Sequence, residues 1–90
     1  MLPAHRQPTH PGEILLKEFL EPMDLSQAEL AKRMGVPIQR INTLVNSKRG
    51  ITAETALLLS RQLKTTAEFW MNLQNASDLY EAKQTLKHAA

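Results

Sequence analysis

The stretch "MGVPIQRINTLVNSKRG", residues 34–50, contains a very tight turn between two predicted helices. Gly35 and Pro37 interrupt an apolar pattern that resumes at Ile41 and Leu44, where a helix would bury one side. Glycine supplies the left-handed conformation that commonly ends a helix, and proline suits the first position of the next one. Two helices joined by so short a turn form a helix-turn-helix unit, whose second helix fits the major groove of DNA. We therefore expect the polar face of the second helix to touch base edges.

The flanking sequence predicts an all-α fold with five helices. Pro11 suits the first position of a helix that His10 or Thr9 caps, and Pro22 ends this helix. The segments "SQAE" and "TTAE" both have the spacing of a capping box. The last residues, "KQTLKHAA", are expected to fray. The expected helices begin near Pro11, Ser26, Pro37, Thr52 and Thr65.

Length and composition indicate one small domain over residues 1–90, with a core at about 10–82 and flexible termini. The chain has no cysteine, which excludes disulfides, thiolate metal sites and a cysteine nucleophile. No stretch approaches the roughly 18 to 20 apolar residues that span a bilayer, so we expect a cytoplasmic protein with no membrane partner.

Neither an enzymatic activity nor a cofactor is expected from the sequence. His5, His10 and His88 lack the spacing of metal ligands on one helix face. The chain also contains no glycine-rich phosphate loop, no Gly-x-Ser-x-Gly motif and no paired His-Glu zinc motif.

Positive charge is concentrated in the region of the predicted turn. The net charge of the chain is +2, yet residues 26–50 contain five Lys or Arg residues and a single Glu. Such an excess suits a polyanionic partner, because neutralisation of phosphates dominates nucleic-acid affinity. On charge alone, a solvated basic face is an equally good interpretation.

Three further motifs carry a resemblance to a known family: "HPGEIL" at 10–15, "NSKRGIT" at 46–52 and "EFWMNLQ" at 68–74. Together with the helix-turn-helix segment, they make the chain similar to HigA-type antitoxins, also called virulence-associated protein I or plasmid-maintenance antidote proteins, of the XRE class. The resemblance covers roughly residues 8–82. It implies a five-helix, usually dimeric protein that binds double-stranded operator DNA, represses its own operon and neutralises a RelE-like, HigB-type toxin that cleaves mRNA.

Individual residues can then be given expected roles. By the resemblance, Gln27 matches a glutamine that touches a phosphate and steadies the second helix of the unit, although it could be an ordinary exposed glutamine. Gln39 is the strongest candidate for base recognition, because an amide can pair with two edge atoms of adenine. Arg40 can reach guanine or a phosphate. The other candidates are Asn42 and Thr43 as exposed neighbours or plain surface, Lys48 and Arg49 as phosphate clamps, and Asn46 as a support for the loop.

The sequence departs from the family pattern at the start of the second helix. Position 37 is often Ser or Thr, which can cap the helix and bind a phosphate, whereas the side chain of Pro37 can do neither. Position 38 is commonly polar, and Ile38 either contacts an apolar group such as a thymine methyl or folds into the core. Ser47 and Asp24 stand where glycine is frequent, in expected left-handed turns. Because Pro37 and Ile38 differ from the family pattern at the start of the second helix, the operator sequence of relatives cannot be transferred to this chain.

Two questions stay open from the sequence. One alternative to the combined function is a stand-alone regulator without a toxin, and another is mainly a protein-binding inhibitor with weak DNA binding. The dimer contact is not evident, and the last helix, near Leu79 and Tyr80, is the preferred candidate.

Phe69 and Trp70 are predicted to be core, since large aromatic side chains at helical spacing usually seal a small domain.

Overall fold

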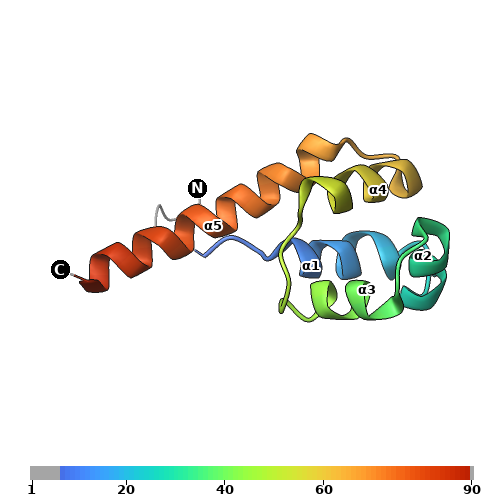
Figure 1. Ribbon diagram of the computed structural model, residues 1–90, viewed down its shortest axis with the longest axis horizontal. Coiled ribbons are helices and arrows are strands. Elements are labelled where there is room, and N and C mark those ends of the chain that lie inside the picture. The colour runs from blue at the N-terminus through green and yellow to red at the C-terminus, as the bar shows by residue number, and fades with distance from the viewer. Residues whose placement is uncertain (1–6, 90) are drawn as a thin grey trace.

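The computed structural model describes residues 7–89, which form helices and no strand (Figure 1). The elements are α1 (Pro11–Ile14), the π-helical segment η1 (Leu15–Leu20), α2 (Gln27–Met34), α3 (Ile38–Val45), α4 (Ala53–Leu63) and α5 (Ala67–Ala89). Because α1 and η1 together correspond to the first predicted helix, the all-α five-helix prediction is confirmed. The flexibility expected of residues 1–6 concerns a segment outside the described residues.

The first helix begins as the sequence predicts. His10 caps it, because its Nδ1 accepts a hydrogen bond of 2.9 Å from the backbone N–H of Gly12, and Pro11 occupies the first turn. After α1 the backbone changes to π-helical geometry, with the Glu21 N–H donating to the Leu16 carbonyl at 3.0 Å. The sequence does not predict this change.

The π-helical segment carries two buried leucines. Leu15 and Leu20 are five positions apart and both are buried in the core. In a π-helix, with hydrogen bonds that span five residues, two residues five positions apart lie nearer to the same face of the helix than they do in an α-helix. The chain then turns at Asp24, which adopts a positive φ of 52°, the left-handed conformation expected at this position.

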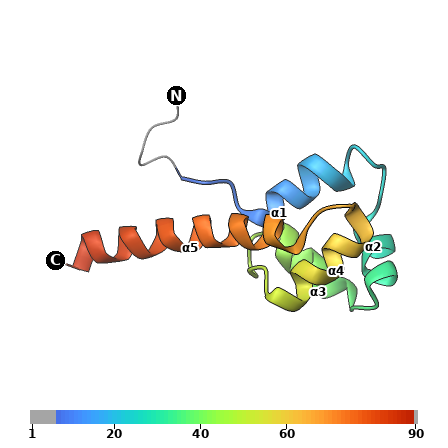
Figure 2. The ribbon, with the colours of Figure 1, turned by 90° about the horizontal axis from the view of Figure 1, so that it is seen from above.

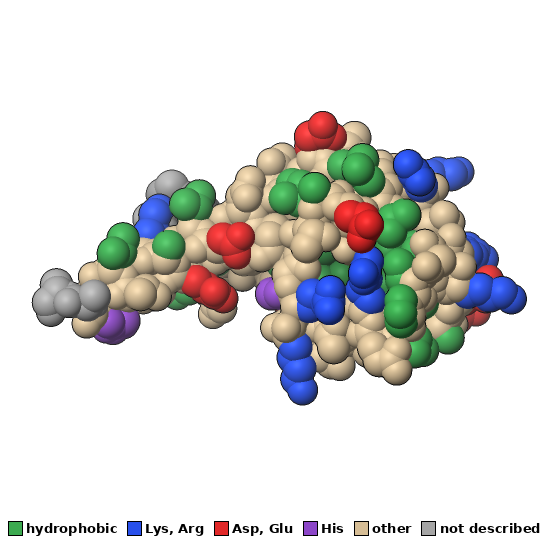
Figure 3. Space-filling model, viewed as in Figure 1, with side chains coloured by type: hydrophobic (Ala, Val, Ile, Leu, Met, Phe, Trp, Pro, Cys, Tyr) green, Lys and Arg blue, Asp and Glu red, His purple; other side chains and the backbone are tan. Residues whose placement is uncertain are grey.

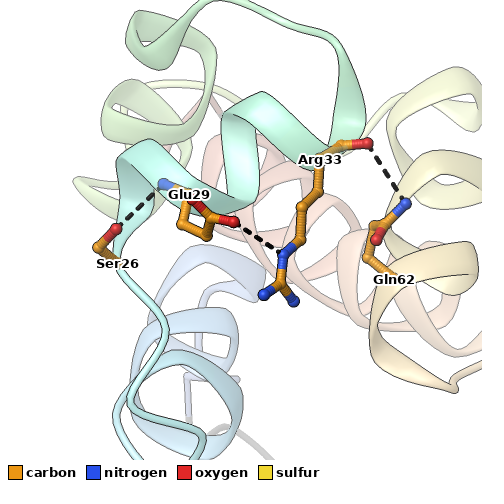
Figure 4. Close-up of polar contacts among 4 residues, drawn as sticks. All are labelled: Ser26, Glu29, Arg33 and Gln62. Atoms are coloured by element: carbon orange, nitrogen blue, oxygen red, sulfur yellow. Dashed lines mark hydrogen bonds and ion pairs between the residues drawn. The ribbon is translucent and has the colours of Figure 1, made fainter.

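The start of α2 has half of the predicted capping box (Figure 4). The Ser26 hydroxyl accepts a 3.0 Å hydrogen bond from the Glu29 N–H, as predicted. The Glu29 carboxylate does not reach back to Ser26 and instead accepts a 3.2 Å bond from Nε of Arg33. The Arg33 carbonyl in turn accepts a bond from the Gln62 side chain of α4, at 3.4 Å. The end of α2 is thereby attached to α4.

The turn between α2 and α3 is a Schellman motif. Gly35 has a φ of 71°, and its N–H donates to the Lys32 carbonyl at 3.2 Å, while the Val36 N–H donates to the Ala31 carbonyl at 3.0 Å. Pro37 is extended and is the residue before α3, so its predicted place as the first helical residue is wrong by one position. The reason is that the Val36 N–H is still bonded to the last turn of α2, so Pro37 is the extended residue that connects the two helices.

Hydroxyl groups cap the last two helices. Thr52 accepts a 3.2 Å bond from the Thr55 N–H at the start of α4, as predicted. At α5 the cap is Thr66, which accepts from the Phe69 N–H at 3.0 Å, and not Thr65 as predicted. The Thr65 hydroxyl is engaged elsewhere, since it accepts a 2.7 Å bond from the indole N–H of Trp70.

Helix α5 is longer than the sequence predicts. It continues to Ala89, although fraying was expected from residue 83, and its C-terminal half projects beyond the other helices in both ribbon views (Figures 1 and 2). None of the helices in residues 7–89 has the length and apolar character needed to cross a bilayer.

The core is sealed by Trp70, whose side chain has no exposed surface. Its ring centroid lies 5.3 Å from that of Phe19 and 5.0 Å from that of Phe69. The prediction that Trp70 is core is confirmed, but Phe69 is 37% exposed and stands at the edge of the cluster. The other fully buried large side chains are Pro11, Leu15, Leu30, Ile41, Leu44 and Leu59.

Candidate nucleic-acid interface

Helix α3 is held from two sides by the rest of the fold. Its apolar residues Ile41 and Leu44 have no exposed surface, and α2 and α1 both pack against the helix. The contact with α1 is at backbone distance, because a Cβ atom added to Gly12 would overlap the Leu44 carbonyl oxygen and lie 3.1 Å from the Val45 Cα. This close approach explains the glycine of the "HPGEIL" motif and fixes the orientation of α3.

The face of α3 away from this packing carries the residues that the sequence singled out. Pro37, Ile38 and Gln39 are exposed, and Arg40, Asn42 and Thr43 are partly exposed. Ile38 was left between two roles, and with 39% of its surface exposed it faces solvent instead of entering the core. The start of α3 therefore presents an apolar side chain next to the amide of Gln39.

Two members of this face already have intramolecular partners. The Arg40 guanidinium donates a 3.0 Å hydrogen bond to the Glu54 carboxylate at the start of α4, within an ion pair. The Thr43 hydroxyl donates to the Gln39 carbonyl at 2.8 Å, so its hydrogen atom is used within α3. Arg40 must therefore exchange Glu54 for DNA if it is to contact a base or a phosphate, and Thr43 can offer an incoming group mainly its oxygen or methyl.

The loop after α3 has a fixed backbone and exposed cations. Ser47 has a φ of 61°, its N–H donates to the Leu44 carbonyl at 3.0 Å, and the Lys48 N–H donates to the Thr43 carbonyl at 2.8 Å. This is a second Schellman motif, with Ser47 in the left-handed position. Lys48 and Arg49 are exposed, and Figure 3 shows Lys and Arg side chains around this loop and between α3 and α4, with others at the opposite end of the globular part.

The expected support from the Asn46 side chain is not found. Within residues 7–89 this side chain makes no hydrogen bond, whereas the Asn46 backbone N–H donates to the Asn42 carbonyl at 3.0 Å. The loop is ordered by backbone bonds, so Asn46 is exposed and free to meet another molecule.

Gln27 begins α2 and is partly buried. It lines a shallow groove together with Leu16 and Glu21 of the preceding segment. Its predicted contact with a phosphate is neither favoured nor excluded by this position, and stays a prediction.

Two residues that act on this face are not predicted by the sequence pattern. Glu54 holds Arg40, although the two are fourteen positions apart, and the packing of α4 on α2 and α5 brings the start of α4 to Arg40. Gln74 of α5 accepts a 2.6 Å hydrogen bond from the Ile51 N–H, directly after the basic loop. Its place at the end of the "EFWMNLQ" motif was the one available signal.

Comparison with known proteins decides the family. A model of the helix-turn-helix family matches residues 16–70. Virulence-associated protein I of Dichelobacter nodosus is 52% identical over 83% of this chain and 69% of its own length, and antitoxin HigA-1 of Vibrio cholerae is 38% identical over 100% and 85%. The chain belongs to the HigA-type antitoxin family of XRE-class helix-turn-helix proteins. The resemblance stated from the sequence motifs is thereby confirmed.

Solved structures of this HigA-type family have the same fold. Antitoxin GraA is 46% identical, with a TM-score of 0.86 over 89% of this chain and 86% of GraA. The structure described as Pseudomonas aeruginosa antitoxin HigA with the higBA promoter is 41% identical, with a TM-score of 0.85 over 93% and 96%. The second of these structures thus contains the relative together with its promoter.

Proposed function

We propose that this HigA-type chain is a DNA-binding autorepressor that also neutralises a RelE-like, HigB-type toxin. The observation that carries the DNA-binding part is the exposed polar face of α3, which is flanked by the cations of a fixed loop. The solved relative with its promoter DNA supports the same role. The proposed contacts are those of Gln39 with base edges and of Lys48 and Arg49 with phosphates.

We further propose that two copies bind one operator. A two-fold dimer places two recognition helices in successive major grooves roughly 34 to 36 Å apart. The projecting part of α5 supports this proposal, because Leu79 and Leu86 lie seven positions apart with 60% and 72% of their surfaces exposed. Leucines at that spacing share one helix face and suit packing against a second copy.

Replacing both Gln39 and Arg40 by alanine should abolish operator recognition. Loss of the Gln39 base contact removes about 1 to 3 kcal/mol of discrimination, so operator affinity should fall at least about fivefold from this contact alone, and further because the charge of Arg40 is lost. Binding to a scrambled duplex should fall less, because phosphate contacts carry no sequence information. Fluorescence anisotropy with labelled operator and scrambled DNA measures both effects.

The matched control replaces Gln84 and Lys87, an amide and a cation of the projecting part of α5 that lie off the face of Leu79 and Leu86, by alanine. It removes the same charge and should leave operator affinity within about twofold. An equal loss in the two double variants would contradict the assignment of α3 as the reading surface. Toxin neutralisation should survive in Gln39→Ala/Arg40→Ala.

Glu54→Gln should strengthen binding to both duplexes. The substitution frees the Arg40 guanidinium and removes a negative charge beside the proposed interface. One added phosphate contact should make the slope of log K against log salt steeper by about 0.9. Glu68→Gln, the same substitution in the first turn of α5, is the control. Weaker operator binding by Glu54→Gln would instead mean that Glu54 aligns Arg40 for base contact.

The toxin part of the proposal has its own test. Co-expression with the reading frame next to the gene should yield a complex that co-purifies with this chain. If no neighbouring product binds while operator binding persists, the chain is a stand-alone regulator. If a toxin binds while operator and scrambled DNA bind equally weakly, it is mainly a protein-binding inhibitor.

A further inference from the structure

Gln74 connects α5 to the end of the basic loop. Its Oε1 accepts a hydrogen bond of 2.6 Å from the Ile51 N–H, and its Nε2 donates one of 2.8 Å to the Asp78 carboxylate, one turn further along α5. Ile51 is almost fully buried, so its N–H has no solvent to replace this partner. The chemistry fixes the orientation of the amide: a carboxylate only accepts, so Nε2 must face Asp78 and Oε1 must face Ile51.

Gln74 also sets how closely the loop approaches α5. A Cβ atom added to Gly50 would lie 2.9 Å from Gln74 Oε1, so the loop backbone rests directly on this side chain. Lys48 and Arg49 immediately precede this contact. The Schellman motif at Ser47 fixes the beginning of this loop. The contacts of Gln74 with Gly50 and Ile51 fix its end.

The same side chain keeps an acidic group occupied. Beside this contact lies a groove of about 300 Å³, which is lined by Lys48 and Arg49 of the loop and by Asp78 and Glu81 of α5. Despite these facing charges, neither loop cation forms an ion pair with a described residue. One carboxylate oxygen of Asp78 accepts a hydrogen bond from Gln74, and since Lys48 and Arg49 have no ion pair with a described residue, both cations are available to an external anion.

From this geometry we infer that Gln74 is a positioning residue for the phosphate contacts of Lys48 and Arg49. It acts through the backbone of the loop and touches no DNA itself. The inference rests on the proposed DNA binding and deepens it, because it makes the affinity for DNA phosphates depend on a residue of α5. The effect is independent of DNA sequence, since α3 is not involved.

The test compares two variants that keep the net charge of the wild-type chain. Gln74→Met keeps the length of the side chain and removes both hydrogen bonds. Gln74→Glu/Asp78→Asn keeps the bond from the Ile51 N–H and reverses the direction of the bond between positions 74 and 78. The new carboxylate can accept from both the Ile51 N–H and the new amide. Gln84→Met, the same substitution ten positions along α5, is the control.

Anisotropy titrations at several salt concentrations use the operator and the scrambled duplex. Gln74→Met should bind both about tenfold more weakly, with a slope of log K against log salt that is shallower by about 0.9 for each lost contact. Gln74→Glu/Asp78→Asn and Gln84→Met should match the wild type. An unchanged slope in Gln74→Met, or a failure of the reversed pair to restore it, would overturn the inference.

Hydrogen exchange at the Ile51 amide gives a readout without DNA. Exchange should be faster in Gln74→Met and restored in Gln74→Glu/Asp78→Asn, and equal exchange in all three chains would refute the hold on the loop. If the wild type binds the two duplexes equally, operator recognition fails while the salt slopes still test Gln74. If it binds neither duplex, both the proposed function and the role of Gln74 in DNA binding are refuted.

Discussion

Gly12→Ala should lower the free energy of unfolding by at least about 3 kcal/mol. Overpacking of a core typically costs about 1 to 3 kcal/mol, and the cost is at the upper end or above when backbone atoms must move. The added methyl group would overlap the Leu44 carbonyl oxygen, a backbone atom that no side-chain rotation can move. Helix α1 and the last turn of α3 would have to separate. Urea denaturation followed by circular dichroism measures the loss.

Gly35→Ala is the control that separates overlap from backbone conformation. No atom lies within 4 Å of a Cβ at Gly35, yet its φ of 71° is unfavourable for alanine. The expected loss is about 1 kcal/mol. If Gly12→Ala were no more destabilising than Gly35→Ala, the close approach of α1 to α3 would be wrong.

Trp70→Ala should destabilise the protein by about 3 to 5 kcal/mol, the range for removing a large buried aromatic side chain. This is a large part of the roughly 5 to 13 kcal/mol expected for a domain of this length. The indole packs on Phe19 and Phe69 and donates to Thr65, so truncation leaves a cavity and an unpaired hydroxyl. Thermal and urea unfolding of the variant measure the effect.

Phe69→Ala provides the comparison at the neighbouring position. Its ring is partly exposed at the rim of the same cluster, so its loss should be about 1 to 2 kcal/mol. Comparable losses at the two positions would contradict the description of Trp70 as the centre of the core.

Local interactions are the part of the fold that the sequence predicts well. His10, Ser26 and Thr52 cap helices as expected, because each accepts from a backbone N–H two or three residues away. The errors arise where a distant side chain competes. The Trp70 indole takes the hydroxyl of Thr65 and moves the α5 cap to Thr66. The π-helical turns after α1, in which Leu15 and Leu20 are both buried, are not revealed by apolar periodicity alone.

The candidate interface follows the same division. Helical periodicity is enough to place Gln39 opposite the buried Ile41 and Leu44. It is not enough to pair Arg40 with Glu54 or Ile51 with Gln74, because those contacts depend on how α4 and α5 pack beside the helix-turn-helix. The role of α5 in ordering the basic loop was therefore beyond the reach of sequence patterns.

The most direct test of the account is an anisotropy titration of the wild-type chain with the DNA upstream of its own gene. A scrambled duplex serves as the competitor, and both are measured at two salt concentrations. The account predicts binding at least about 10³-fold tighter to the upstream DNA, with both affinities falling as salt rises. Equal and weak binding to the two duplexes would contradict the proposal that α3 reads an operator.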